Sequence, residues 1–160
     1  MVYGAILEKG QIWYTKLGKV FDAIQDKQTS YNWLITDMDG VPAGIGECSG
    51  GKEYCWLTGE ELTRIVRAND EQWAWAVLSG FHKNVPLEEI LTFPRPYADG
   101  YTGFWNNPIS IQHPLAAVEI VPWDSSLTLF FSEQKELVDE FMEFFPLSEE
   151  LSAYNVRGND

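Results

Sequence analysis

The spacing of apolar residues predicts three amphipathic helices. One set has the three- and four-residue spacing of a single helical face: Leu17, Val20, Phe21 and Ile24. Thr58, followed three positions later by Glu61, forms the pattern of a capping box and predicts that a helix begins there. A third apolar stripe predicts a helix over residues 133–145, ended by Pro146.

Other segments have the pattern of β-strands and hairpins. Residues 31–38 are rich in aromatic and β-branched types, and residues 73–78 are apolar at every position, which indicates an interior strand. Three pairs of short segments flank turn residues and predict hairpins: 2–8 with 11–14, 44–48 with 53–57, and 115–121 with 127–131. The order of elements predicts a single α+β domain over residues 1–160, with a mainly antiparallel sheet and two or three packed helices.

Residues 93–114 fit neither pattern. Proline and glycine interrupt the segment repeatedly, yet it carries five aromatic residues. A loop of this length is unusual in a compact domain and is often functional. Tyr101 and Trp105 are therefore candidate contact residues, either in a protein-binding surface or in a small-ligand-binding module that uses Trp105. The alternative is that Trp105 packs beneath the loop.

Composition and charge exclude several classes of partner. The 160 residues are 45% hydrophobic and 14% aromatic, enough to bury a core. Acidic residues number 24 and basic residues 11, so the net charge of −13 argues against binding to nucleic acid or to an anionic membrane. No apolar run approaches the ~18 residues of a membrane span, and the first residues lack the pattern of a secretory signal. We therefore expect a cytoplasmic protein.

The acidic residues concentrate on the helix predicted near the C-terminus. Residues 96–160 contain 11 acidic residues and only two basic ones. A rotation of about 100° per residue places five carboxylates on one side of that helix: Glu133, Glu136, Asp139, Glu140 and Glu143. Like charges four positions apart destabilise a helix by ~0.2–0.5 kcal/mol per pair. This side is a candidate docking face for a basic protein partner; the alternative is an ordinary solvated acidic surface.

Residues 33–41 end an apolar strand in Asp37-Met38-Asp39-Gly40 and resemble the first motif of haloacid-dehalogenase-type phosphatases. The resemblance implies that Asp37 is the nucleophile, that Asp39 is the acid/base, and that both help to hold Mg²⁺. The acidic pair that this family has farther along the chain is not evident here. The preferred interpretation is a strand followed by an Asp-Gly turn, with a phosphatase-like hydrolase as the alternative.

The cysteines and histidines give no clear metal or catalytic site. Cys48 and Cys55 would lie opposite each other in the predicted hairpin, within reach of a disulfide, but a cytoplasmic location favours reduced thiols. A zinc site would need two more ligands, and His82 and His113 are isolated in the sequence. We therefore expect no metal, no cofactor and no catalytic residues.

Two stretches resemble small acidic bacterial proteins of uncharacterised function, some of which belong with immunity proteins against antibacterial toxins. The first contains Phe21-Asp22-Ala23-Ile24 and then Tyr31-Asn32-Trp33. The second runs from Val118-Glu119-Ile120-Val121 through Asp124-Ser125-Ser126 to Phe141, and ends in Phe145-Pro146-Leu147-Ser148-Glu149-Glu150-Leu151 and Tyr154-Asn155. The resemblance implies a binding role. The sequence therefore predicts a non-enzymatic acidic protein-binding domain, of the kind of an immunity-type inhibitor.

Overall fold

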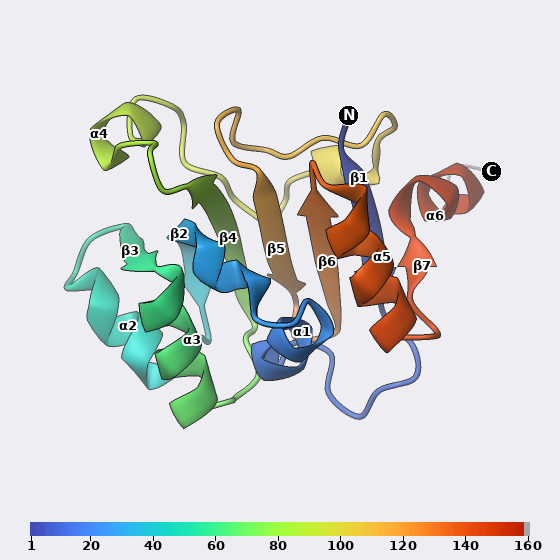
Figure 1. Cartoon of the computed structure of the whole chain (residues 1–160), viewed down its shortest axis with the longest axis horizontal. Helices are drawn as coiled ribbons and strands as arrows, with labels where there is room; N and C mark the ends of the chain where they lie inside the picture. Colours follow the sequence, from blue (N-terminus) through green and yellow to red (C-terminus); the bar gives the residue numbers. More distant parts are fainter. Residues whose placement is uncertain (159–160) are drawn as a thin grey trace.

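Seven strands form one sheet in the computed structural model of the chain, which describes residues 1–158 (Figure 1). Their order across the sheet is β3-β2-β4-β5-β6-β1-β7. The strands are β1 Tyr3–Leu7, β2 Tyr31–Asp39, β3 Tyr54–Thr58, β4 Trp75–His82, β5 Val118–Trp123, β6 Leu127–Ser132 and β7 Glu149–Glu150. All neighbouring strands are antiparallel, which confirms the predicted α+β class.

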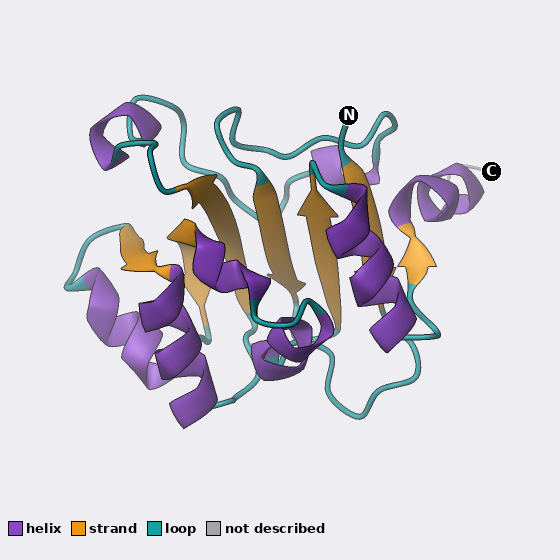
Figure 2. Ribbon diagram, viewed as in Figure 1, coloured by secondary structure: helices purple, strands orange, loops and turns teal. Residues whose placement is uncertain are grey.

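Helices cover one face of the sheet, as Figure 2 shows. On that side lie α1 Leu17–Ala23, α2 Ala43–Ser49, α3 Gly59–Ala68 and α5 Lys135–Phe144. The remaining helices are α4 Leu87–Ile90, α6 Leu151–Gly158 and the 3-10 turns η1 Lys27–Ser30 and η2 Gly103–Trp105. No helix within residues 1–158 has both the length and the apolar character needed to cross a membrane.

The sheet is apolar on both faces, because successive side chains of a strand point to opposite sides. In β6, Phe130 packs among the helices, whereas Leu129 and Phe131 belong to a second cluster on the other side. That second cluster includes Ala98 and Phe104 from the long irregular segment. We call residues 93–117 the cover segment, because they close the sheet face that carries no long helix.

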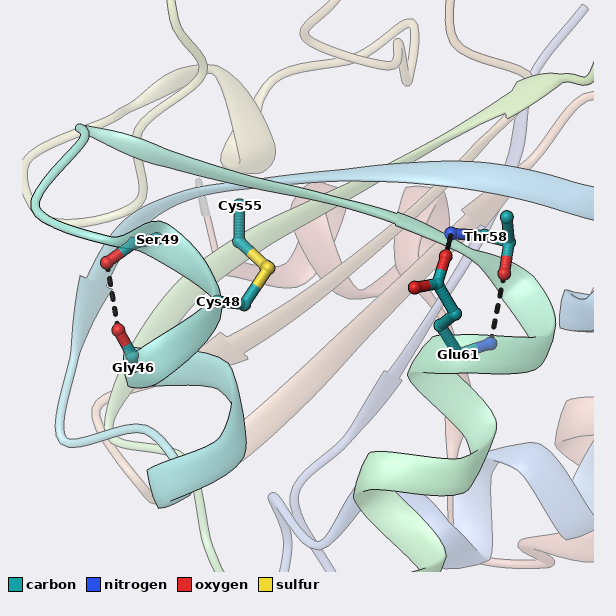
Figure 3. The surroundings of a disulfide bond; sticks show 6 residues. All are labelled: Gly46, Cys48, Ser49, Cys55, Thr58 and Glu61. Carbon is teal, nitrogen blue, oxygen red and sulfur yellow. Dashed lines mark hydrogen bonds between the residues drawn. A yellow bond between two sulfur atoms is a disulfide. The ribbon is translucent and has the colours of Figure 1, made fainter.

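The structure confirms several local predictions. The four apolar residues of α1 and the turn that follows it are at most 1% exposed. Thr58 and Glu61 form the predicted capping box at the start of α3: the Glu61 N–H donates to Thr58 Oγ1 at 3.1 Å, and the Thr58 N–H donates to the Glu61 carboxylate at 3.0 Å (Figure 3). β5 and β6 form the predicted hairpin, with Asp124 and Ser125 in the left-handed region that such turns use.

Two predicted hairpins are wrong. Residues 44–48 belong to helix α2, whose Ile45 is buried in the core on the helical side of the sheet, while β3 lies at the edge of the sheet. Gly44 also lies against α3: a Cβ there would come within 2.8 Å of Ile65 Cγ2, so glycine permits the close packing of the two helices. Residues 11–14 are not a strand either, because β1 pairs with β6 and β7.

Cys48 and Cys55 form a disulfide, so the expectation of reduced thiols is wrong. The bond joins α2 to β3, and the two Cα atoms are 5.6 Å apart (Figure 3). We expected the two cysteines to lie close together because they would face each other in a hairpin. In the structure Cys48 lies near the end of helix α2, which brings it over β3. The disulfide does not support the expected cytoplasmic location, because disulfides are more typical of oxidising compartments.

We predict that neither cysteine reacts with a thiol reagent when the protein is unfolded without reductant. The bond closes a loop between residues seven positions apart, which in the chain-entropy description stabilises the fold by about 2.5 kcal/mol. Reduction should therefore expose two thiols and lower the melting temperature. Two reactive thiols in the untreated protein would contradict the prediction.

Glu119 is fully buried between the sheet and the cover segment. One carboxylate oxygen accepts a hydrogen bond of 2.9 Å from the Gln112 N–H. Ser79, also fully buried, lies opposite it on β4. Burial raises the pKa of Glu119 from its usual 4.5 to about 8, and the hydrogen bond from Gln112 only partly offsets this effect. The carboxyl group is therefore protonated in the folded protein at neutral pH.

This buried carboxyl should make the protein less stable as pH rises from about 4.5 to 8. In that window the unfolded chain loses the proton while the folded chain keeps it, so the free energy of unfolding falls with pH and levels off above the window. Glu119→Gln should remove this slope and raise stability at pH 8 by on the order of 3 kcal/mol. Denaturant unfolding across the pH range measures both effects, with exposed Glu53→Gln as the control. An unchanged slope in Glu119→Gln would contradict the pKa assignment.

Candidate functional site

Helix α5 presents one apolar face and one acidic face, as its spacing predicted. Leu137, Val138 and Phe141 are buried, and the Phe141 ring stacks on Phe130 of β6 with centroids 5.0 Å apart. On the outer side Glu140 is half-buried, and Glu136, Asp139 and Glu143 are exposed. Glu133 is exposed as well, but it precedes the helix, which begins at Lys135 and not at residue 133 as predicted. The helix is thus held by its aromatic face, which leaves the acidic face outward.

Two of these five carboxylates have a cationic partner. Lys135 lies 2.8 Å from Asp139, one turn along the same helix. Lys27, from η1, is paired with Glu140. Within residues 1–158, Glu133, Glu136 and Glu143 make no ion pair. The acidic face is therefore less charged than the sequence alone indicated, but it keeps three unpaired carboxylates.

The acidic face continues into a pocket of about 360 Å³ between α1 and α5. Its lining residues are Asp22, Ala23, Gln25, Glu140, Glu143 and Phe144. Phe144 is 46% exposed, which is unusual for so large an apolar side chain. Arg67 approaches Asp22 at 2.8 Å but does not line the pocket. Three carboxylates and an exposed ring thus share one hollow, a combination that suits an arginine or lysine side chain. Neither Asp22 nor Phe144 was expected from the sequence to be a contact residue.

A larger and more apolar pocket, of about 610 Å³, lies on another side of α5. Val138 and Met142 of α5 line it together with residues 1–4 and 107–109. The ion pair of Lys135 and Asp139 and the polar residues Glu150 and Ser152 complete its wall. The acidic helix therefore has a hollow on each of two sides, one charged and one apolar.

Tyr101 and Trp105 lie on the opposite face of the sheet from α5, so the structure does not bring the two groups of predicted contact residues together. Both rings are half-buried beside the second core cluster. Tyr101 contacts Phe104 with centroids 4.6 Å apart, and Trp105 contacts Trp123 and Tyr154. Trp105 also lines a pocket of about 430 Å³ with Glu8, Trp123, Leu127, Tyr154, Asn155 and Gly158. The sequence pattern gave no sign that Glu8, Trp123 and Tyr154 meet.

Asp37 and Asp39 lie at the end of β2, where the strand is irregular. Asp37 has a φ of 53°, in the left-handed region. Its carboxylate accepts hydrogen bonds from the backbone N–H groups of Ala98 at 2.8 Å and Asp99 at 3.2 Å. Asp37 therefore anchors the cover segment, a role that the predicted turn did not include. The parallel sheet that the phosphatase resemblance implies is replaced here by an antiparallel one, so the geometry gives that alternative no support.

His113 is also accounted for by the fold. It is 1% exposed, and its two ring nitrogens meet the Ile90 carbonyl at 2.9 Å and the Leu115 N–H at 3.1 Å. Burial lowers its pKa, which agrees with a neutral ring that accepts at Nδ1 and donates from Nε2. Among the residues that the structure describes, no three His, Cys, Asp or Glu side chains are grouped so that they could hold a metal ion.

Comparison with protein-family models, curated proteins and solved structures finds no significant match to this chain. The function of this chain is therefore inferred from its pockets, its charges and its aromatic contacts.

We predict that Asp37→Ala lowers the free energy of unfolding by about 1–3 kcal/mol, because it removes the acceptor for two backbone donors. Asp37→Asn should lose less than about 1 kcal/mol, since its amide oxygen still accepts and asparagine tolerates the left-handed region. Denaturant unfolding separates the two variants. Mg²⁺-dependent phosphatase turnover that Asp37→Asn abolishes would instead restore the catalytic interpretation.

Proposed function

We propose that this chain is a non-enzymatic protein-binding domain whose α5 surface receives basic side chains of a partner protein. The observation that carries the proposal is the pocket between α1 and α5, which Glu140, Glu143 and Asp22 line together with the exposed Phe144. Glu143 makes no ion pair within the described residues, whereas Glu140 pairs with Lys27 and Asp22 with Arg67. Such a hollow can hold both halves of an arginine: the alkyl stem against the ring and the guanidinium among the carboxylates.

The unpaired carboxylates outside the pocket support fast association. Glu133 and Glu136 are exposed and make no ion pair within the described residues. Together with the net charge of −13, they give this side a field that attracts a basic surface before contact. Charges placed in this way raise the association rate more than they raise affinity.

The apolar pocket on the other side of α5 would supply the buried part of such an interface. Protein interfaces generally combine an apolar centre with a polar margin. Val138, Met142 and Ile109 give this pocket its apolar wall, and the Lys135–Asp139 pair lies beside them. A partner that covers α5 would thus bury apolar area and meet carboxylates in the same contact.

Within this proposal, an immunity-type inhibitor is the more specific function. The resemblance to acidic immunity proteins supports it, and so does the fit between carboxylates and the basic residues around a nuclease active site. A cytoplasmic location was expected from the sequence and belongs to the same proposal, but the Cys48–Cys55 disulfide counts against that part. The unreactive cysteines predicted above would contradict the location and leave the binding proposal untouched.

We predict that Glu136→Lys with Glu143→Lys weakens capture of a basic partner at least tenfold at low salt, an effect of about 1.4 kcal/mol or more. The purified chain is immobilised, and the proteins it retains from native lysate are identified and quantified over a salt series. We leave Glu140 unchanged because it pairs with Lys27. The double variant should keep its stability within about 0.5 kcal/mol, because the new lysine at 136 lies near Asp139 and Glu140 on the helix.

The matched control is Glu53→Lys with Glu71→Lys. Both residues are exposed and distant in sequence from α5, and the pair changes the net charge by the same amount. Capture of the same basic protein should persist in this control. Equal loss in both variants would show only an effect of total charge, and would contradict a specific α5 surface.

A further inference from the structure

The pocket around Trp105 has walls made mainly of aromatic rings. Trp105 stands nearly perpendicular to Trp123, with centroids 5.9 Å apart, and is tilted against Tyr154 at 6.2 Å. All three side chains are half-buried, so part of each ring remains accessible at a hollow of about 430 Å³. Three aromatic side chains thus border one space, and the face of an aromatic ring carries the negative part of its quadrupole.

Three separate elements position these rings. Trp105 comes from η2, Trp123 ends β5, and Tyr154 belongs to α6. Asn155 follows Tyr154, and its side chain donates a hydrogen bond of 3.1 Å to the carbonyl of Phe104, which precedes Trp105. This bond links α6 to η2 beside the two rings. Trp75 lies opposite Trp123 on β4, and their rings are 5.1 Å apart. The walls are therefore fixed by the fold before any ligand arrives.

Glu8 supplies the only charged side chain among the lining residues of this pocket. It makes no ion pair within residues 1–158, because the nearby cations Lys9 and Arg157 both pair with Glu149. Burial raises the pKa of the Tyr154 hydroxyl, and the carboxylates of Glu8 and Glu149 raise it further. The phenol is therefore neutral at physiological pH, and among the described lining residues Glu8 alone carries a negative charge.

The Tyr154 ring already has a cation in contact. The guanidinium of Arg157 lies 5.7 Å from its centroid, yet Arg157 is not among the residues that line the pocket. A positive group is thus compatible with this ring in the folded protein.

We propose that this pocket binds a small organic cation with a trimethylammonium group. Such a group is poorly hydrated and makes no hydrogen bonds, so aromatic faces and one carboxylate satisfy it. A primary ammonium carries three N–H donors and is strongly hydrated, and aromatic side chains replace that hydration poorly. An anionic ligand is disfavoured by the charge of Glu8. This site lies on the sheet face opposite α5 and does not depend on the function proposed above.

Choline and tetramethylammonium are the probes for a titration followed by NMR. The indole N–H resonances of Trp105 and Trp123 should shift with a dissociation constant in the range of about 0.1–10 mM. Trp13, which is 51% exposed and lies outside the pocket, serves as an internal control whose resonance should not move. Absence of any shift at Trp105 up to about 50 mM probe would overturn the proposal.

A neutral probe separates charge from shape. In 3,3-dimethyl-1-butanol a carbon replaces the nitrogen of choline, so size is kept and the charge is lost. We expect it to bind at least about fivefold more weakly than choline. Equal affinity for the two compounds would show an ordinary apolar pocket and would overturn the assignment of a cation site.

Substitutions localise the effect. Glu8→Gln should weaken choline binding severalfold and leave the alcohol unaffected, and since Glu8 is partly exposed and unpaired we expect the variant to fold. Trp105→Leu should weaken choline at least about fivefold, whereas Tyr154→Phe keeps the ring and should retain binding. Trp13→Ala is the matched control for removal of a tryptophan. Choline binding that survives both Glu8→Gln and Trp105→Leu would contradict the proposed site.

A peptide that carries trimethyllysine tests the source of the headgroup. Binding at least about tenfold tighter than that of choline would assign the pocket to a modified protein tail. Weaker or equal binding would assign it to a free small molecule. Either result requires that the headgroup is recognised, which the choline titration establishes first.

Discussion

A sheet that is apolar on both faces has to be covered twice, and most of this structure follows from that requirement. The strands β4, β5 and β6 bury nearly every side chain on either side. Helices cover one face by ordinary amphipathic packing. The other face is closed by the cover segment, whose prolines prevent a regular hydrogen-bond ladder. The cover segment therefore stabilises this face through side chains such as Ala98 and Phe104, which shield the strands from solvent.

An irregular cover needs polar side chains to satisfy its backbone, because no ladder does so. Asp37 accepts from two of its N–H groups, and Gln112 exchanges two hydrogen bonds with the backbone of Tyr97, at 3.0 and 2.9 Å. Glu119, which lies on the sheet beneath the cover segment, accepts a hydrogen bond from the Gln112 N–H. The carboxyl groups of Asp37 and Glu119 thus hold the backbone of the cover segment, although the sequence around Asp37 at the end of a strand resembles a catalytic motif.

The sequence predicted those features that depend on neighbouring residues, and failed where the outcome depends on distant ones. Helix α1, the capping box at Thr58 and the two faces of α5 follow from local spacing. Whether residues 44–48 form a strand or a helix depends on tertiary packing, here of Gly44 against Ile65 of α3 and of Ile45 in the core. The pairing of Glu140 with Lys27 joins positions 113 apart in the chain. The pocket around Trp105 draws on η2, β5, β6 and α6 and on Glu8, which follows β1. Local sequence patterns do not contain such long-range contacts. For this reason the sequence overstated the number of unpaired carboxylates near α5.

The two surfaces of this chain obey different physical rules. On α5 the carboxylates stand on flexible exposed side chains, so their attraction acts at long range and weakens as salt screens it. Around Trp105 the rings have few rotatable bonds and are held by neighbouring contacts, so little entropy is lost when a ligand enters. The first arrangement favours rapid encounter with a large charged partner, and the second favours selection by shape among small ones. Because the sheet lies between them, occupation of one surface leaves the other accessible.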